Sequence, residues 1–96
     1  MNLDVCYERD PSIVARDIAG EMILVPIRKS VGDLESIYTL NETAAFVWER
    51  FDGDHTLAEV RDAVMEEFEV ELGVVKADLL ELVVQLEQVG AVRRVE

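Results

Sequence analysis

Residues 41–59, with the sequence NETAAFVWERFDGDHTLAE, contain two helix starts separated by a turn. Asn41 is a favourable N-cap because its side chain can accept a hydrogen bond from a free backbone N–H of the first turn. Glu42 in that turn complements the positive end of the helix dipole. The stretch predicts a first helix over residues 42–51, which the Asp-Gly-Asp turn at residues 52–54 ends.

The second helix start is a capping box. Thr56 and Glu59 have the spacing at which each side chain accepts a hydrogen bond from the other's backbone N–H. A helix over residues 57–68 is predicted. Its apolar residues recur at intervals of three and four and form one buried stripe: Leu57, Val60, Val64 and Phe68.

A third helix is predicted over residues 72–89. Gly90 is placed as its C-cap glycine, and residues 91–95 follow as a short extended tail. The helix start is weak, because Glu71 is a mediocre N-cap and Gly73 disfavours the first turn. Four residues form a stripe that should face the core: Leu79, Leu82, Val83 and Leu86.

Upstream, the chain is rich in β-branched residues. Gly20 separates two candidate strands, residues 13–18 and 21–27, so we expect a β-hairpin. Residues 28–35 lack periodicity and are predicted to be a loop. Residues 36–40 have the composition of a short third strand.

Together these elements predict an α+β domain with a three-stranded antiparallel sheet followed by three helices. The two closely spaced helices and the third one are typical of a winged helix-turn-helix. At 96 residues, of which 50% are apolar, the chain is expected to form one domain over residues 1–96.

The charge balance argues against nucleic-acid binding. With 9 Lys and Arg against 21 Asp and Glu, the formal net charge is -12. Such a surface repels phosphate, and the third helix carries Asp78, Glu81 and Glu87 where a DNA-reading helix would need basic residues. We therefore expect no nucleic-acid partner despite the helix-turn-helix layout.

The sequence offers no constellation for catalysis or metal binding. One cysteine, Cys6, and one histidine, His55, make neither a catalytic pair nor a ligand cluster, and His55 is expected to be a turn residue. Trp48 lies on the apolar stripe of the first helix and should be a core residue. No enzyme activity, cofactor or metal is expected.

No apolar run approaches the length of a membrane span, and residues 1–10 contain no stretch of signal-peptide character. We expect a cytoplasmic protein that does not bind membranes.

An ordered set of short motifs resembles the PQQ-biosynthesis protein D family. The set includes Val14-Ala15-Arg16-Asp17 and Gly20-Glu21 in the hairpin, Leu40 to Ala45, Trp48, Asp52-Gly53, Thr56-Leu57, and Asp78 to Leu86 followed by Gly90. The resemblance covers residues 12–92, which we take as the core of the domain. The sequence departs from the family at the start of the third helix, where Glu71-Leu72 replaces the usual Asp-Pro.

The resemblance implies a RiPP recognition element, a noncatalytic adaptor that binds the leader of a ribosomally made precursor peptide. Such a module presents the peptide to a modifying enzyme, often of the radical S-adenosylmethionine class. The expected partners are thus a precursor peptide and that enzyme, with a homodimer left open. The alternative is an acidic protein–protein interaction or regulatory domain with no role in peptide modification.

The third strand is the expected docking point, because a sheet edge without charge, proline or bulge can accept an added strand. Leu80 and Val84 on the third helix are expected to form a groove wall beside it. The residues expected to contact the peptide are Ser36, Ile37, Tyr38, Thr39, Leu40, Leu80, Val83, Val84 and Glu87. The alternatives are an ordinary edge protected by its shortness, and a third helix that buries Leu80 and Val84 on two sides.

Overall fold

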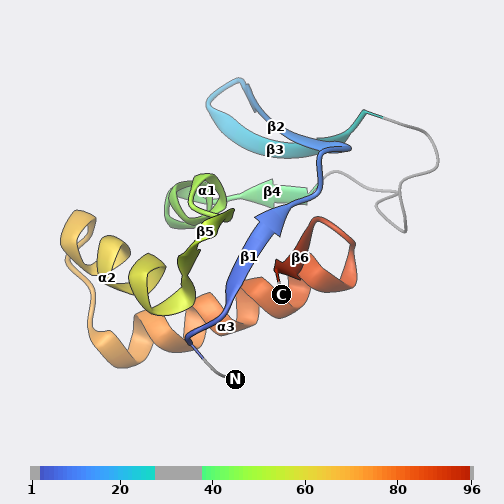
Figure 1. Cartoon of the computed structure of the whole chain (residues 1–96). Coiled ribbons are helices and arrows are strands. Elements are labelled where there is room, and N and C mark those ends of the chain that lie inside the picture. Colours follow the sequence, from blue (N-terminus) through green and yellow to red (C-terminus); the bar gives the residue numbers. More distant parts are fainter. Residues whose placement is uncertain (1–2, 28–37, 96) are drawn as a thin grey trace.

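The computed structural model describes residues 3–27 and 38–95 (Figure 1). The elements in chain order are β1 (Cys6–Arg9), β2 (Ile13–Ile18), β3 (Glu21–Pro26), β4 (Tyr38–Leu40), α1 (Glu42–Glu49), β5 (Asp52–Thr56), α2 (Leu57–Glu67), α3 (Leu72–Gln88) and β6 (Val92–Val95). The predicted α+β class is confirmed: a three-stranded antiparallel sheet, β2-β3-β4, precedes three helices.

The predicted hairpin is present, with β2 and β3 joined by a two-residue turn. Ala19 and Gly20 both have positive φ, of 54° and 84°, as a type I′ hairpin turn requires. The register pairs Ile18 with Glu21 next to the turn and Ile13 with Pro26 at the far end. β4 then pairs with β3 and completes this sheet.

A second sheet, in the order β5-β1-β6, was missing from the sequence-based prediction. Both of its outer strands pair antiparallel with β1. β1 is only four residues long, and residues 52–56 are turn-forming types, so local propensity gave no strand signal. The extended tail predicted after Gly90 is β6, which is held by its pairing with β1.

The helix boundaries agree with the predictions to within two residues. The Asn41 side chain accepts a hydrogen bond from the Ala44 N–H, and both bonds of the Thr56–Glu59 capping box form. Gly90 has a φ of +75°, as expected for a C-cap glycine. None of the helices in residues 3–27 and 38–95 is long and apolar enough to cross a membrane.

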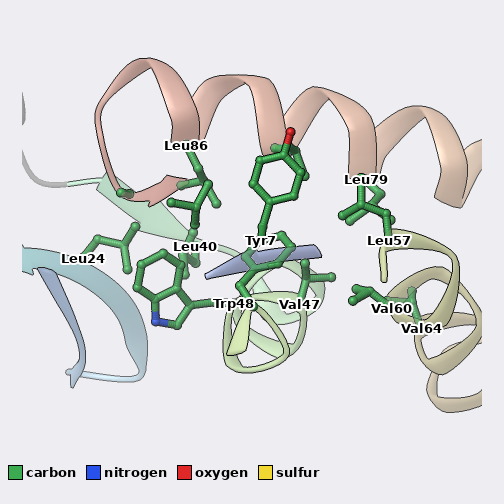
Figure 2. Close-up of a cluster of buried hydrophobic side chains, with 14 of the residues drawn as sticks. Tyr7, Leu24, Leu40, Val47, Trp48, Leu57, Val60, Val64, Leu79 and Leu86 are labelled. Atoms are coloured by element: carbon green, nitrogen blue, oxygen red, sulfur yellow. The ribbon is translucent and has the colours of Figure 1, made fainter. Parts of the chain in front are cut away.

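One hydrophobic core joins both sheets to the helices (Figure 2). Phe51, Leu57 and Leu86 are completely buried, and Tyr7 on β1 packs its ring 6.3 Å from that of Phe51. Trp48 is 3% exposed, which confirms it as a core residue. β3 contributes Leu24 to the same core, so the hairpin sheet is fixed relative to the helices.

His55, expected to be a turn residue, lies within β5, three residues after Asp52. Its Nδ1 lies 2.9 Å from the Asp52 carboxylate at the surface. The hydrogen bond to His55 lowers the pKa of Asp52 to about 2, and the same bond raises the pKa of His55. The pair links the two ends of the turn at the start of β5.

The capping box makes a first prediction. Thr56→Ala removes the acceptor for the Glu59 N–H and should lower the free energy of unfolding by about 1 kcal/mol, as measured by urea denaturation. Glu66→Ala, at an exposed position of the same helix, should change it by less than about 0.5 kcal/mol. An equal effect of both substitutions would contradict the role assigned to the cap.

The Asp52–His55 pair makes a second prediction, on pH dependence. The pKa of His55 is higher in the folded protein than its ordinary value of 6.5. The contribution of His55 to stability is therefore fully present below pH 6.5 and is lost as the pH rises through the pKa of the folded state. Because the pKa of Asp52 falls from 3.8 to about 2, its contribution is lost as the pH falls below about 4. An NMR titration should place the His55 pKa above 6.5, and Asp52→Asn should return it toward that value. Asp54→Asn is the control and should have a smaller effect, since Asp54 contributes least to the shift.

Candidate functional site

The edge of the hairpin sheet beyond β4 is unpaired in the part of the chain that the structure describes. The C-terminal strand, which could have covered it, pairs with β1 instead. Thr39 at the centre of β4 is exposed, and β4 carries no charge, proline or bulge. The expected open edge is therefore present, although the structure describes only Tyr38–Leu40 of the predicted strand; Ser36 and Ile37 lie outside the described residues.

The hydrogen-bond pattern of the hairpin shows which backbone groups of β3 point toward β4. The Ile27 N–H donates to the Ser12 carbonyl at 2.8 Å, so residues 12 and 27 form a hydrogen-bonded pair. Such pairs alternate along an antiparallel ladder, so residues 21, 23 and 25 bond to β2. Met22 and Leu24 consequently direct their backbone groups toward β4. Pro26 has the same orientation, which is why its missing N–H costs the hairpin no bond.

The same alternation determines the orientation of β4. Met22 pairs with Leu40, and Leu24 pairs with Tyr38. These pairs use the backbone groups of Tyr38 and Leu40, so the N–H and carbonyl of Thr39 point away from β3. Thr39 thus presents one donor and one acceptor at the outer edge of the sheet.

A cavity of about 380 Å³ lies beside this edge. One wall comes from β4 and the start of α1 and comprises Tyr38, Thr39, Leu40, Asn41, Thr43 and Ala44, with Val47 behind them. The opposite wall comes from α2, the following turn and α3: Val64, Val70, Val74, Val75, Asp78, Leu79, Glu81, Leu82 and Gln85. An extended chain at the β4 edge would place alternate side chains over this cavity.

The floor of the cavity is apolar and its rim is polar. Val64, Val75 and Leu79 belong to the buried core, whereas Val74 on the rim is 51% exposed. An apolar floor with polar groups around it is typical of a ligand groove.

A hydrogen bond spans the cavity between its two walls. The Tyr38 hydroxyl on β4 donates to Gln85 Oε1 on α3 at 2.6 Å. The Gln85 amide in turn donates to Glu81 Oε1 at 3.3 Å. Burial, and secondarily the nearby charge of Glu81, raises the pKa of Tyr38, so its hydroxyl remains a donor at neutral pH. These two hydrogen bonds connect β4 to α3 across the cavity.

None of the α3 residues expected to contact the peptide lines this cavity. Val83 is completely buried in the core. Glu87 accepts a hydrogen bond from the Tyr7 hydroxyl at 3.2 Å, which places it on the side of β1. Leu80 and Val84 do not line the cavity; Leu80 packs partly against the core and Val84 is 41% exposed.

Helix geometry explains why these residues lie outside the cavity lining. At 100° per residue, Leu80 and Val84 lie about 100° and 140° from Leu79 in one direction, whereas Leu82 and Gln85 lie about 60° and 120° in the other. Sequence alone could not distinguish the two flanks while β1 and β6 were unassigned. The recurrence of Val74, Asp78, Glu81 and Gln85 at spacings of four, three and four is the sequence pattern that indicates the flank of α3 facing the cavity.

Within the described residues, no group of three or more His, Cys, Asp or Glu side chains could hold a metal ion. Cys6 is a free thiol on β1. The features of this site are those of a binding groove: an open strand edge, an apolar floor and a polar rim.

Comparison with known proteins agrees with this architecture. The family model of coenzyme PQQ synthesis protein D (PqqD) matches residues 21–92, which is most of the chain. The chain belongs to the PqqD family. The match confirms the resemblance stated from the sequence motifs and includes β4, α1 and the whole of α3.

Two solved structures are similar to this PqqD-family protein. A lasso peptide synthetase B1 complexed with the leader peptide has a TM-score of 0.72 and 26% identity, covering 91% of this chain and 96% of that one. TbiB1 in complex with the TbiA(beta) leader peptide has a TM-score of 0.71 and shares the fold at 17% identity, covering 90% and 94%. No curated protein sequence matches this chain.

Proposed function

We propose that this PqqD-family protein is a noncatalytic adaptor that binds the leader of a ribosomally made precursor peptide. The leader adds as a strand to the outer edge of β4, and the adaptor presents the peptide to a modifying enzyme. The observation that carries the proposal is the outward-facing backbone of Thr39 beside the cavity between β4 and α3. In this mode of recognition, main-chain hydrogen bonds supply affinity, and pockets for alternate side chains supply specificity.

The likeness to known structures supports the same ligand class. The lasso peptide synthetase B1 was solved with a leader peptide, and this chain covers nearly all of it. The proposed contact residues on the sheet are Ser36, Ile37, Tyr38, Thr39 and Leu40. On α3 we propose Val74, Leu82 and Gln85 in place of Leu80, Val83, Val84 and Glu87, because the former line the cavity.

The proposed partner is the enzyme that modifies the peptide. Membership of the PqqD family supports an enzyme of the radical S-adenosylmethionine class, and co-purification of the adaptor with the enzyme encoded beside it tests this part of the proposal. In this proposal the chemistry resides in that enzyme, and the adaptor contributes the peptide-binding groove.

The central test removes the outward donor of β4. Thr39→Pro deletes the Thr39 N–H without breaking a bond to β3, so the sheet should remain folded. Binding of synthetic leader peptides from short reading frames encoded beside this gene should weaken roughly three- to tenfold, the value of one hydrogen bond. Isothermal titration measures the affinity, and circular dichroism checks the fold.

Thr39→Val is the matched control, because it removes the hydroxyl and keeps the N–H. It should bind the leader peptides like the unmodified protein. Peptide-induced NMR shifts should follow β4 and the Val74–Gln85 flank of α3. Shifts confined to the exposed face of α2, together with unchanged binding by Thr39→Pro, would show that the strand edge is not the site.

A further inference from the structure

The charged side chains of the cavity between β4 and α3 are all acidic. Asp78 and Glu81 line it, and none of its lining residues in the described part of the chain is Lys, Arg or His. Both carboxylates are exposed and lie on the polar rim above the apolar floor. A peptide in this cavity therefore meets negative charge next to an apolar surface.

No cation of the described chain neutralises these carboxylates. Among the described residues, neither Asp78 nor Glu81 forms an ion pair, and Glu81 receives only the Gln85 amide. Lys76, the basic residue of α3, is two residues from Asp78 and therefore points about 160° away around the helix. The net charge of -12 adds a long-range attraction for positive ligands.

We infer that the peptide recognised by this groove carries a Lys or Arg on the same face as an apolar anchor residue, two positions from it. The inference rests on the proposed function and specifies the chemistry of its ligand. The anchor packs over Leu79 and Leu82, and the basic side chain pairs with Asp78 and Glu81.

The spacing follows from the geometry of the two walls. Alternate residues of a strand lie on one face about 6.6–7 Å apart, and only these face α3 when the strand pairs with β4. Asp78 and Glu81 are three residues apart on α3, a rise of about 4.5 Å. Around the helix, both carboxylates lie on the same side of the floor residues Leu79 and Leu82, toward the rim of the cavity. The apolar stem of a Lys or Arg is long enough to cross the exposed Val74 rim while its charged end reaches a carboxylate.

The test is a selection of peptides rather than one assumed ligand. A display library of random 12-residue peptides is selected on the unmodified protein and on three variants. The double variant Asp78→Asn/Glu81→Gln removes the two charges without changing side-chain size. Glu66→Gln/Glu67→Gln on α2 changes the net charge equally at exposed positions outside the cavity. Thr39→Pro reports on strand addition.

The unmodified protein and Glu66→Gln/Glu67→Gln should enrich peptides with an apolar residue and a Lys or Arg two positions apart. Asp78→Asn/Glu81→Gln should keep the apolar preference and lose the basic one. An enriched synthetic peptide should bind this variant roughly three- to tenfold more weakly, the range for a pair of partly exposed ion contacts, and with a weaker dependence on salt.

Two results would overturn the inference, and they differ. In the first result, the enriched peptides have an apolar anchor and bind Thr39→Pro more weakly, but they show no preference for Lys or Arg, or they show the same preference on both double variants. The charge inference then fails and the adaptor function stands. If no enriched peptide depends on Thr39, strand addition at β4 fails, and the charge inference fails with it.

Discussion

The burial of one face of α3 is the interaction on which the rest of the structure depends. Val75, Leu79, Val83 and Leu86 form a continuous apolar stripe against a core to which both sheets contribute. Figure 2 shows Leu79 and Leu86 of this stripe among other core side chains. Four such side chains contribute on the order of 6–12 kcal/mol of hydrophobic stabilisation. Because this stripe determines the rotation of the helix, it also determines which residues face the groove beside β4 and which face β1.

The second sheet explains why the β4 edge is available. β6 follows α3 directly, and its pairing with β1 directs the C-terminal strand away from β4. Arg93 of β6 also bonds Glu8 of β1 through its Nε, 2.6 Å from Oε1. A sheet edge left open in this way is normally an aggregation risk. Here β4 is three residues long, and the carboxylates of the facing helix repel a second acidic copy of the chain.

Local sequence signals predicted most elements and failed where pairing partners are distant in the chain. The Thr56 capping box, the Gly90 C-cap and the Ala19–Gly20 turn are decided by neighbouring residues, so they could be predicted and were confirmed. β1 and β5 have little strand propensity of their own and exist because they pair across more than 40 residues. On the strand side, Tyr38, Thr39 and Leu40 line the cavity as expected of the docking edge, and their contact with a peptide stays a prediction. On α3 the expected contact residues do not line the cavity, because the wide apolar arc of that helix leaves two possible flanks, and the sheet that was not predicted decides which flank faces β4.

The charge of the groove favours a peptide over a nucleic acid as the ligand of this helix-turn-helix-like layout. A nucleic acid requires cations spaced along its phosphates, whereas α3 carries carboxylates along its groove flank. A peptide strand requires a free backbone edge to pair with. Because its side chains alternate, the residues on one face of the strand can contact both an apolar floor and an acidic rim. The outward N–H and carbonyl of Thr39 are independent of peptide sequence, and they would bind any extended chain equally. In the proposed binding mode, selectivity would therefore come from the α3 wall. There Asp78 and Glu81 would disfavour acidic peptides, and exchange of a few residues on one flank would change the ligand without altering the core.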